Sequence, residues 1–247
     1  MKNKIIKKIM GLFGYKLVEK DYIKNMRAQS SNTYLNIKNL LNTYCEQNKL
    51  RTLLQIGAND GERFDELNYF IKKYKIKSVL VEPINKYFNE LKKNYSNYEF
   101  VKVENSAISV NNEISYLFMV NDKNINRYDE HVKGISSFEI QHLIKHGVKK
   151  NHIEKKKINS LSLQDLIKKY NISKLDLLYV DTEGYDGKIV YEFIKSTKLK
   201  PIIIFEYIHI KNNFFNRLID LLNDKKFKFF AINENLICYP PEKEFLI

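Results

Sequence analysis

Short apolar runs alternate with amphipathic segments through most of the chain. The runs have the length of buried strands, and the segments between them carry apolar residues at helical spacing. This alternation predicts a parallel sheet whose strands are joined by right-handed helical crossovers. The predicted strands are RTLLQI (51–56), KSVLVE (77–82), YEFVKV (98–103), EISYLFMV (113–120), LDLLYV (175–180) and PIIIFEY (201–207), and the predicted helices are 62–74, 84–94, 161–170, 186–196 and 212–224.

The ends of the chain and one internal segment depart from this pattern. Residues 1–48 are polar and rich in Asn, so we expect a helical N-terminal extension before a single Rossmann-like domain at 49–247. Near the C-terminus, FKFFAI and LICY flank the turn NEN and predict a hairpin. Residues 121–157 are polar and show no clear core signal. The expected fold class is α/β.

The first twenty residues, MKNKIIKKIMGLFGYKLVEK, are basic and interrupted by lysines, with no small-residue cleavage pattern behind them. No apolar run in the chain reaches the ~18 residues of a membrane-spanning helix, so we expect a cytoplasmic protein. Ile5, Ile9, Leu12 and Phe13 would share one face of a short basic helix. Such a helix either lies on an anionic membrane surface or packs on its own domain or a partner chain.

The formal net charge of +13 draws attention to nucleic acid as a partner. The lysines are spread over nearly every segment, however, so solvated lysine faces are the simpler interpretation and no nucleic-acid partner is expected. Cys45 and Cys238 lie far apart and outside any metal-ligand spacing, which favours two buried apolar residues. The sequence leaves the oligomeric state open.

Two of the eight glycines follow the first predicted strand, in LLQIGANDG. Gly57 would let the chain turn at the strand end, and Gly61 would let the backbone approach a bound group. Ligands of such sheets bind beyond the carboxyl ends of the strands, and a helix beginning near Glu62 would point its amino end at one. Glu82 ends the next predicted strand, where a carboxylate can accept hydrogen bonds from both hydroxyls of a ribose. Together these features indicate a site for a nucleoside-containing cofactor.

A second glycine-bearing stretch, VDTEGYDG, ends the strand LDLLYV. Asp181 and Glu183 are separated by one residue and would face the same pocket while the chain stays extended. They are candidates for a base and its orienting partner, or for a joint divalent-cation site. In the alternative structural interpretation, Asp181 caps the following helix and Glu183 is solvated.

Further candidates come from three other places. Glu206 and His209 follow the strand PIIIFEY and form a second candidate pair. His142 and His146 would lie on one helix face, but no H-E-x-x-H pattern accompanies them, so a metal site is not predicted. The stretch GISSFE, with Gly134, Ser136 and Ser137, lies in a long polar segment of the kind that often contacts substrate.

Four motifs together resemble the FkbM-type family of S-adenosylmethionine-dependent methyltransferases. They are LLQIGANDGERF, VLVEPINKYFNEL, VENSAIS and LDLLYVDTEGYDGKIV, and the resemblance covers roughly residues 52–208. It implies a seven-stranded methyltransferase sheet with an antiparallel last strand, in agreement with the C-terminal hairpin. It also implies that S-adenosylmethionine is the cofactor and that a sugar or glycan hydroxyl is the acceptor. A divalent metal is an open alternative that is not predicted.

The resemblance also assigns residues to parts of the cofactor. It implies that Gly57, Ala58, Asn59 and Gly61 surround the methionine moiety, that Glu82, followed by Pro83, holds the ribose, and that Asn105, Ser106 and Ala107 lie beside the adenine. Gln55 stands where the family usually has an acid, and Asp181 would lie between cofactor and acceptor. A stretch similar to Gly134, Ser136 and Ser137 lies near the acceptor in the family.

Three other functions compete with this interpretation. A nicotinamide-dependent oxidoreductase would more usually show G-x-G-x-x-G, which the spacing of Gly57 and Gly61 does not match. An RNA ribose methyltransferase would fit the net charge, and a non-catalytic binding protein on a methyltransferase fold would have less need of the glycines and Glu82. We therefore expect an O-methyltransferase, with the last two functions as alternatives.

Overall fold

The computed structural model describes residues 36–63, 65–110 and 115–243, without the side chains of residues 115, 130 and 131. The proposed basic helix near the N-terminus lies outside these residues. The chain separates into two compact units, Met1–Leu40 and Leu41–Ile247. Helix α3, Ile37–Glu46, begins in the first unit and ends in the second. In the part of the chain that is described, no helix is long and apolar enough to span a membrane.

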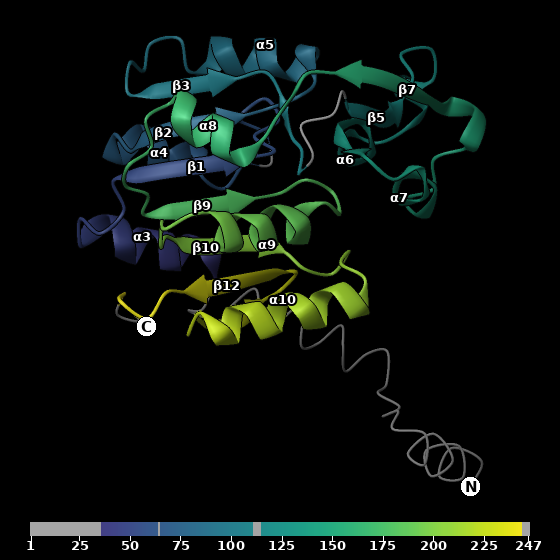
Figure 1. Cartoon of the computed structure of the whole chain (residues 1–247). Helices are drawn as coiled ribbons and strands as arrows, with labels where there is room; N and C mark the ends of the chain where they lie inside the picture. Colours follow the sequence, from purple (N-terminus) through teal and green to yellow (C-terminus); the bar gives the residue numbers. More distant parts are fainter. Residues whose placement is uncertain (1–35, 64, 111–114, 244–247) are drawn as a thin grey trace, which may run out of the picture. The chain divides into compact units, whose positions relative to one another are not determined.

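A seven-stranded sheet forms the centre of the second unit (Figure 1). Its order is β3-β2-β1-β9-β10-β12-β11, and β12 alone among them runs antiparallel to its neighbours. This confirms the predicted α/β class with a mostly parallel sheet and an antiparallel last strand. The strands are β1 Thr52–Ile56, β2 Lys77–Val81, β3 Val101–Glu104, β9 Leu177–Val180, β10 Ile202–Glu206, β11 Lys228–Ile232 and β12 Asn235–Tyr239.

Helices follow the strands along the chain and cover the sheet. Helices α8, α9 and α10 share one hydrophobic cluster with five of its strands, and Figure 1 shows all three on the near face. Their burial excludes water from the apolar side chains between layers, which is the main stabilising contribution to such a fold. The helices of this sheet are α4 Asn68–Tyr74, α5 Asn85–Asn94, α8 Leu163–Lys169, α9 Asp186–Ser196 and α10 Asn212–Asp224.

The first crossover helix begins six residues later than predicted. Asp60 Oδ1 accepts hydrogen bonds from the backbone N–H groups of Glu62 (3.0 Å) and Arg63 (2.8 Å), and Asp65 Oδ1 accepts one from Leu67 N (2.9 Å). These side chains compete with the helical backbone pattern. The predicted helix amino end at Glu62 is therefore wrong, and α4 starts only at Asn68.

The polar segment 121–157, whose sequence shows no clear core signal, has its own small core. It pairs with β5 in a three-stranded antiparallel sheet of order β6-β5-β7. Val120, Val132, Ile135, Leu143 and Val148 are buried together beneath it. The elements are β5 Ser115–Val120, η1 Ile125–Arg127, α6 Glu130–Gly134, β6 Ser136–Ser137, α7 Ile140–Lys145, η2 Lys150–His152 and β7 Ile153–Ile158, and a separate two-stranded sheet pairs β4 Ala107–Ile108 with β8 Ser160–Leu161.

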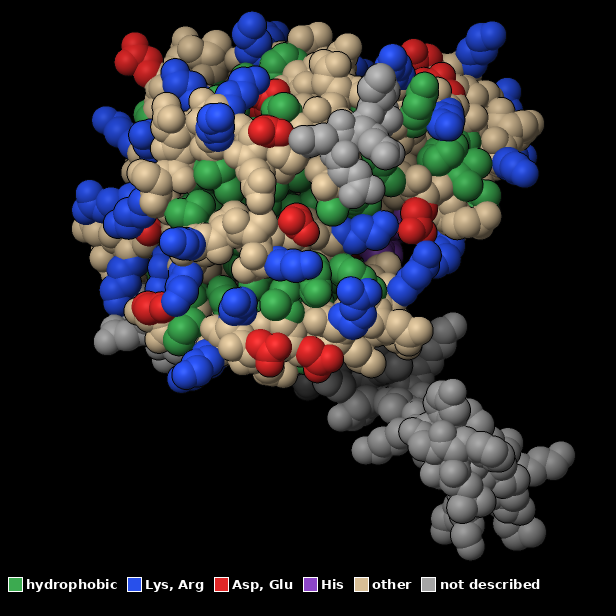
Figure 2. Space-filling view, in the orientation of Figure 1, with side chains coloured by type: hydrophobic (Ala, Val, Ile, Leu, Met, Phe, Trp, Pro, Cys, Tyr) green, Lys and Arg blue, Asp and Glu red, His purple; other side chains and the backbone are tan. Residues whose placement is uncertain are grey.

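Basic side chains do not gather on one region of the surface that Figure 2 shows. Lys and Arg are distributed over the whole visible face, between acidic and hydrophobic side chains. This distribution matches the solvated lysine faces expected from the sequence.

Two contacts hold the central strands β1 and β9 at their opposite ends. At the amino ends, Asp176 Oδ2 accepts hydrogen bonds from the backbone N–H groups of Arg51 and Thr52, both at 3.0 Å. At the carboxyl ends, Gly57 has φ +88° and lies so close to the carbonyl oxygen of Asp181 that a Cβ would overlap it. A side chain at Gly57 would therefore separate the two central strands.

Replacing Gly57 by Ala is expected to lower the free energy of unfolding by about 2–5 kcal/mol, from the positive φ and the collision with Asp181. The matched control is Gly147→Ala, because Gly147 has φ +83° but open space around its missing Cβ. That variant should lose only about 1–2 kcal/mol. Urea unfolding of the three proteins measures the difference. Equal losses in the two variants would show that the contact between β1 and β9 is unimportant.

Candidate functional site

A cavity of about 230 Å³ opens beyond the carboxyl ends of β1, β2 and β9. Gly57, Glu82 and Asp181, which end or follow these strands, all line it. This is the edge at which ligands of parallel sheets bind. The cavity also contacts the start of β4 and the segment around β6. Other sequence-predicted residues on its lining are Gln55, Ala58, Asn59, Pro83, Ser106, Ala107, Gly134, Ser136 and Glu183.

Glu82 is buried at the tip of β2 with both carboxyl oxygens hydrogen-bonded to backbone. Its Oε2 accepts from Asn59 N at 2.9 Å, and its Oε1 accepts from Ile84 N at 2.8 Å. Burial raises the pKa of Glu82 to about 7, although the two hydrogen bonds act to lower it. Each oxygen retains acceptor capacity toward a further donor in the cavity.

The floor of the cavity is acidic. Gln55 is buried, its Nε2 donates to Asp65 Oδ1 at 3.2 Å, and its Oε1 has no hydrogen-bond partner among the described residues. Burial raises the pKa of Asp65 to about 6. Asp181 is open to solvent through the cavity, yet burial among protein atoms, with Asp186 and Glu183 nearby, raises its pKa well above the usual value. An unsatisfied amide oxygen beside several carboxyls suits a cationic ligand group.

The turn after β9 is organised by Asp186, which the sequence interpretation overlooked. The carboxylate of Asp186 accepts hydrogen bonds from Thr182 N at 3.0 Å and Gly184 N at 3.1 Å. The alternative in which Asp181 caps α9 is therefore wrong, because the N-cap of α9 is Tyr185 and it lacks a side-chain cap. With this turn fixed by Asp186, the Asp181 side chain faces the cavity.

Glu183 departs from an extended backbone, with φ +53°, and its side chain turns toward α7. Its Oε2 accepts a hydrogen bond from His142 Nε2 at 2.8 Å, while Ser137 Oγ donates to its main-chain carbonyl at 2.9 Å. The alternative of a solvated Glu183 is therefore wrong. Ser137 is buried and does not line the cavity. Its hydrogen bond to the Glu183 carbonyl stabilises the turn after β9.

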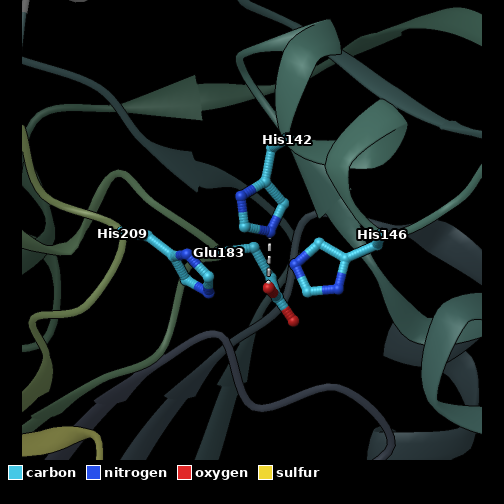
Figure 3. A group of neighbouring side chains, drawn as sticks. All are labelled: His142, His146, Glu183 and His209. Carbon is cyan, nitrogen blue, oxygen red and sulfur yellow. Dashed lines mark hydrogen bonds and ion pairs between the residues drawn. The ribbon is translucent and has the colours of Figure 1, made fainter. Parts of the chain in front are cut away.

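Four ligand-type side chains gather where α7 meets the ends of β9 and β10. Figure 3 shows the imidazoles of His142, His146 and His209 around the carboxylate of Glu183. One nitrogen or oxygen atom from each side chain lies within 4.8 Å of the others. The helix spacing of His142 and His146 is visible in the sequence, but no sequence signal joins them to Glu183 and His209.

Glu206 lies next to His209 of this cluster and does not line the cavity. Its Oε1 is 3.6 Å from Nε2 of His209. Burial, together with Asp181, raises the pKa of Glu206 to about 8. The predicted pair Glu206 and His209 is therefore adjacent in space, but both residues lie outside the cavity lining.

Gly61 and Asn105 also lie outside the described cavity lining. A Cβ on Gly61 would collide with Leu91 and Tyr95, so this glycine allows the chain to pack against α5, not against a ligand. Asn105 Nδ2 donates to the carbonyl oxygens of Glu82 (3.0 Å) and Pro83 (3.3 Å). It holds the end of β2 in place.

Several lining residues were not predicted. Asp65 was hidden because the sequence pattern assigned it to a helix. Tyr87 of α5 donates from its hydroxyl to the carbonyl of Lys133 at 2.7 Å and so joins α5 to the segment before β6. The other polar and aromatic lining residues that were not predicted are Arg63, Glu66, Lys86, Lys133, Phe138, Tyr179 and Thr182.

A comparison with family models identifies the family of this chain. The family model of the methyltransferase FkbM domain matches residues 55–229, which is more than half of the chain. An O-methyltransferase from Bacillus cereus, solved in complex with S-adenosylhomocysteine (SAH), is 10% identical, with 95% of this chain and 96% of that chain covered and a TM-score of 0.44. None of the curated proteins matches this sequence.

Two further solved structures have a similar fold. The MTase domain of METTL16 is 13% identical, with 83% of this chain covered and a TM-score of 0.44. A pre-rRNA processing protein, fibrillarin, from Methanococcus jannaschii is 11% identical, with 77% of this chain covered and a TM-score of 0.40. The chain spans 66% and 65% of the lengths of these two relatives.

The matched family region contains all three strand ends around the cavity. The chain therefore belongs to the methyltransferase FkbM domain family, and residues 55–229 form its methyltransferase domain.

Proposed function

We propose that the protein transfers a methyl group from S-adenosylmethionine to a hydroxyl of a sugar or glycan-type acceptor. The observation that carries this proposal is that Asp181 and Glu183 line one cavity beside the segment 134–138. A hydroxyl is a weak nucleophile until its proton is removed, and a carboxylate within reach can accept that proton. Sugars present such hydroxyls together with other groups that polar side chains can hold.

The residues of the cavity fit the cofactor. Glu82 has acceptor capacity for the two ribose hydroxyls, and Ser106 and Ala107 provide a wall for the adenine. The unpartnered Oε1 of Gln55 suits the ammonium group of the methionine moiety, and Asp65 beside it supplies the negative charge that Gln55 itself lacks. This arrangement supports the cofactor roles inferred for Gln55 and Glu82.

When bound, S-adenosylmethionine supplies an electrophilic methyl group on a positively charged sulfur. In the proposed reaction, Asp181 accepts the proton of the acceptor hydroxyl while the carboxylate floor of the cavity stabilises positive charge. The oxygen–methyl bond forms as the methyl–sulfur bond breaks, and the electron pair of the broken bond stays on sulfur. Gly134 and Ser136 lie across the cavity and would orient the acceptor.

Two finer assignments belong to the same proposal. The dispersed lysines of Figure 2 offer no basic stripe on that face for a nucleic-acid backbone, which favours a sugar over RNA. We also infer a cytoplasmic location, with residues 1–48 as an extension of the catalytic domain. Its basic first twenty residues would bring the enzyme to a lipid-linked acceptor at an anionic membrane surface.

The role of Glu82 predicts a pH-dependent affinity for SAH. The pKa of Glu82 is raised to about 7, and only the ionised carboxylate accepts hydrogen bonds at both oxygens. The ionised fraction rises with pH, so the affinity should increase about tenfold from pH 6 to pH 8. Calorimetric titration of wild type and Glu82→Gln measures this. The variant should bind more weakly and show a smaller increase, and an identical pH profile in both proteins would contradict the assignment.

Replacing Asp181 by Asn should lower the rate of methyl transfer by about 10²–10⁴-fold, because an amide cannot accept the hydroxyl proton. The affinity for SAH should change by less than about tenfold, since Glu82 and Gln55 remain. Asp224→Asn, which alters an exposed carboxylate at the end of α10, is the matched control and should keep full turnover.

Transfer is measured with radiolabelled cofactor and a panel of free sugars, nucleotide-linked sugars and short oligosaccharides, with RNA in parallel. Full turnover by Asp181→Asn would remove its role as proton acceptor. Methylation of RNA and of none of the sugars would overturn the acceptor class while leaving the methyltransferase activity intact.

A further inference from the structure

The histidine cluster has the composition of a metal-binding site. It consists of His142, His146, His209 and Glu183. The chain has five histidines, and three of them meet here. The ring centroids of His142 and His146 are 4.6 Å apart, as are those of His142 and His209, and those of His146 and His209 are 5.6 Å apart. Imidazoles gathered this closely around a carboxylate are the donor set of many metal centres.

The donors come from three separate elements that are fixed independently. His142 and His146 lie on the same face of α7, and His142 is buried. Glu183 is held by the turn after β9, where Ser137 Oγ binds its carbonyl oxygen. His209 follows β10, and both His209 Cβ and His142 Nδ1 would be at an ordinary contact distance of 3.7 Å from a Cβ on Gly184, so both histidines lie next to the turn after β9.

The spacing of the donor atoms is close to that of a coordinated ion. Metal–nitrogen bonds of about 2.0–2.1 Å place ligands on opposite sides of an ion roughly 4 Å apart. The four donor atoms here lie within 4.8 Å of one another. Binding of one ion by all four donors therefore requires side-chain rotations that bring the donor atoms closer together.

We propose that His142, His146, His209 and Glu183 bind one divalent first-row transition-metal ion. Three imidazoles and one carboxylate favour zinc, iron, cobalt or manganese over magnesium and calcium, which prefer oxygen ligands throughout. Glu206 Oε1 lies 3.6 Å from Nε2 of His209, beside the cluster. Carboxylates in such positions commonly orient metal-bound imidazoles.

The site adjoins the acceptor side of the cavity, because Glu183 belongs to both. An ion held there would coordinate the acceptor hydroxyl and lower its pKa, so that Asp181 receives the proton more readily. This role rests on the proposed function, whereas binding of the ion does not. Sequence spacing alone did not predict the site, since α7, β9 and β10 are far apart along the chain.

The test uses the full chain without a histidine tag, freed of metal by a chelator, and titrated with Co²⁺ while its visible absorption is recorded. One equivalent of Co²⁺ should produce ligand-field bands, and Zn²⁺ should displace it. The double variant H142A/H146A should weaken Co²⁺ binding by about 100-fold or more, and Glu183→Gln by about tenfold or more. His152→Gln is the matched control, because His152 is buried against Tyr128 and lies outside the cluster.

Circular dichroism of each variant shows whether it is folded, and only variants with the spectrum of the wild type are compared. SAH binding by the wild type is titrated in parallel. Absence of Co²⁺ bands in the wild type would overturn the metal site, as would unchanged binding by H142A/H146A or its loss in His152→Gln. Co²⁺ binding by a wild type that fails to bind SAH would leave the metal site standing and remove the proposed function. SAH binding without Co²⁺ binding would remove the metal site and leave the proposed function standing.

Discussion

The close approach of Gly57 to the carbonyl oxygen of Asp181 is the constraint on which the site depends. It brings the carboxyl ends of β1 and β9 together more tightly than any residue with a Cβ would allow. On the other side, the N–H groups of Gly57 and Ala58 both donate to the carbonyl of Val81 at 3.0 Å. The carboxyl ends of β1, β2 and β9 are therefore held close together, and the segments that follow these strands line the cavity.

This convergence concentrates acidic groups in a partly buried space, which is costly for a protein by itself. The pKa values of Glu82 and Asp65 are raised chiefly because burial disfavours their charged forms. In the proposed function, a cofactor that carries an ammonium and a sulfonium group would offset that cost on binding. The acidic floor would then be explained by the charge of the ligand and not by the stability of the fold.

In the proposed function, the segment 121–157 forms the acceptor side of the domain. Through α6, β6 and α7 it places Gly134 and Ser136 on the cavity and brings His142 and His146 close to Glu183. Its small core is made of Val120, Val132, Ile135, Leu143 and Val148, none of which belongs to the central sheet. In the proposed function, cofactor and acceptor would be held by two differently built parts of the domain, and specificity for one sugar would reside in the second.

The sequence by itself determined the elements with strong periodicity, including α9 and α10 to their observed bounds, and the strand ends that carry Gly57, Glu82 and Asp181. It did so because hydrophobic period and strand order are local signals. Tertiary structure decided the rest. Because Glu62 N and Arg63 N donate to the Asp60 side chain, α4 begins only at Asn68, and Asp65 lies outside the helix and lines the cavity. The elements of 121–157 are too short for a hydrophobic period to show in the sequence. The histidine cluster joins three distant segments, and only their packing against one another creates it.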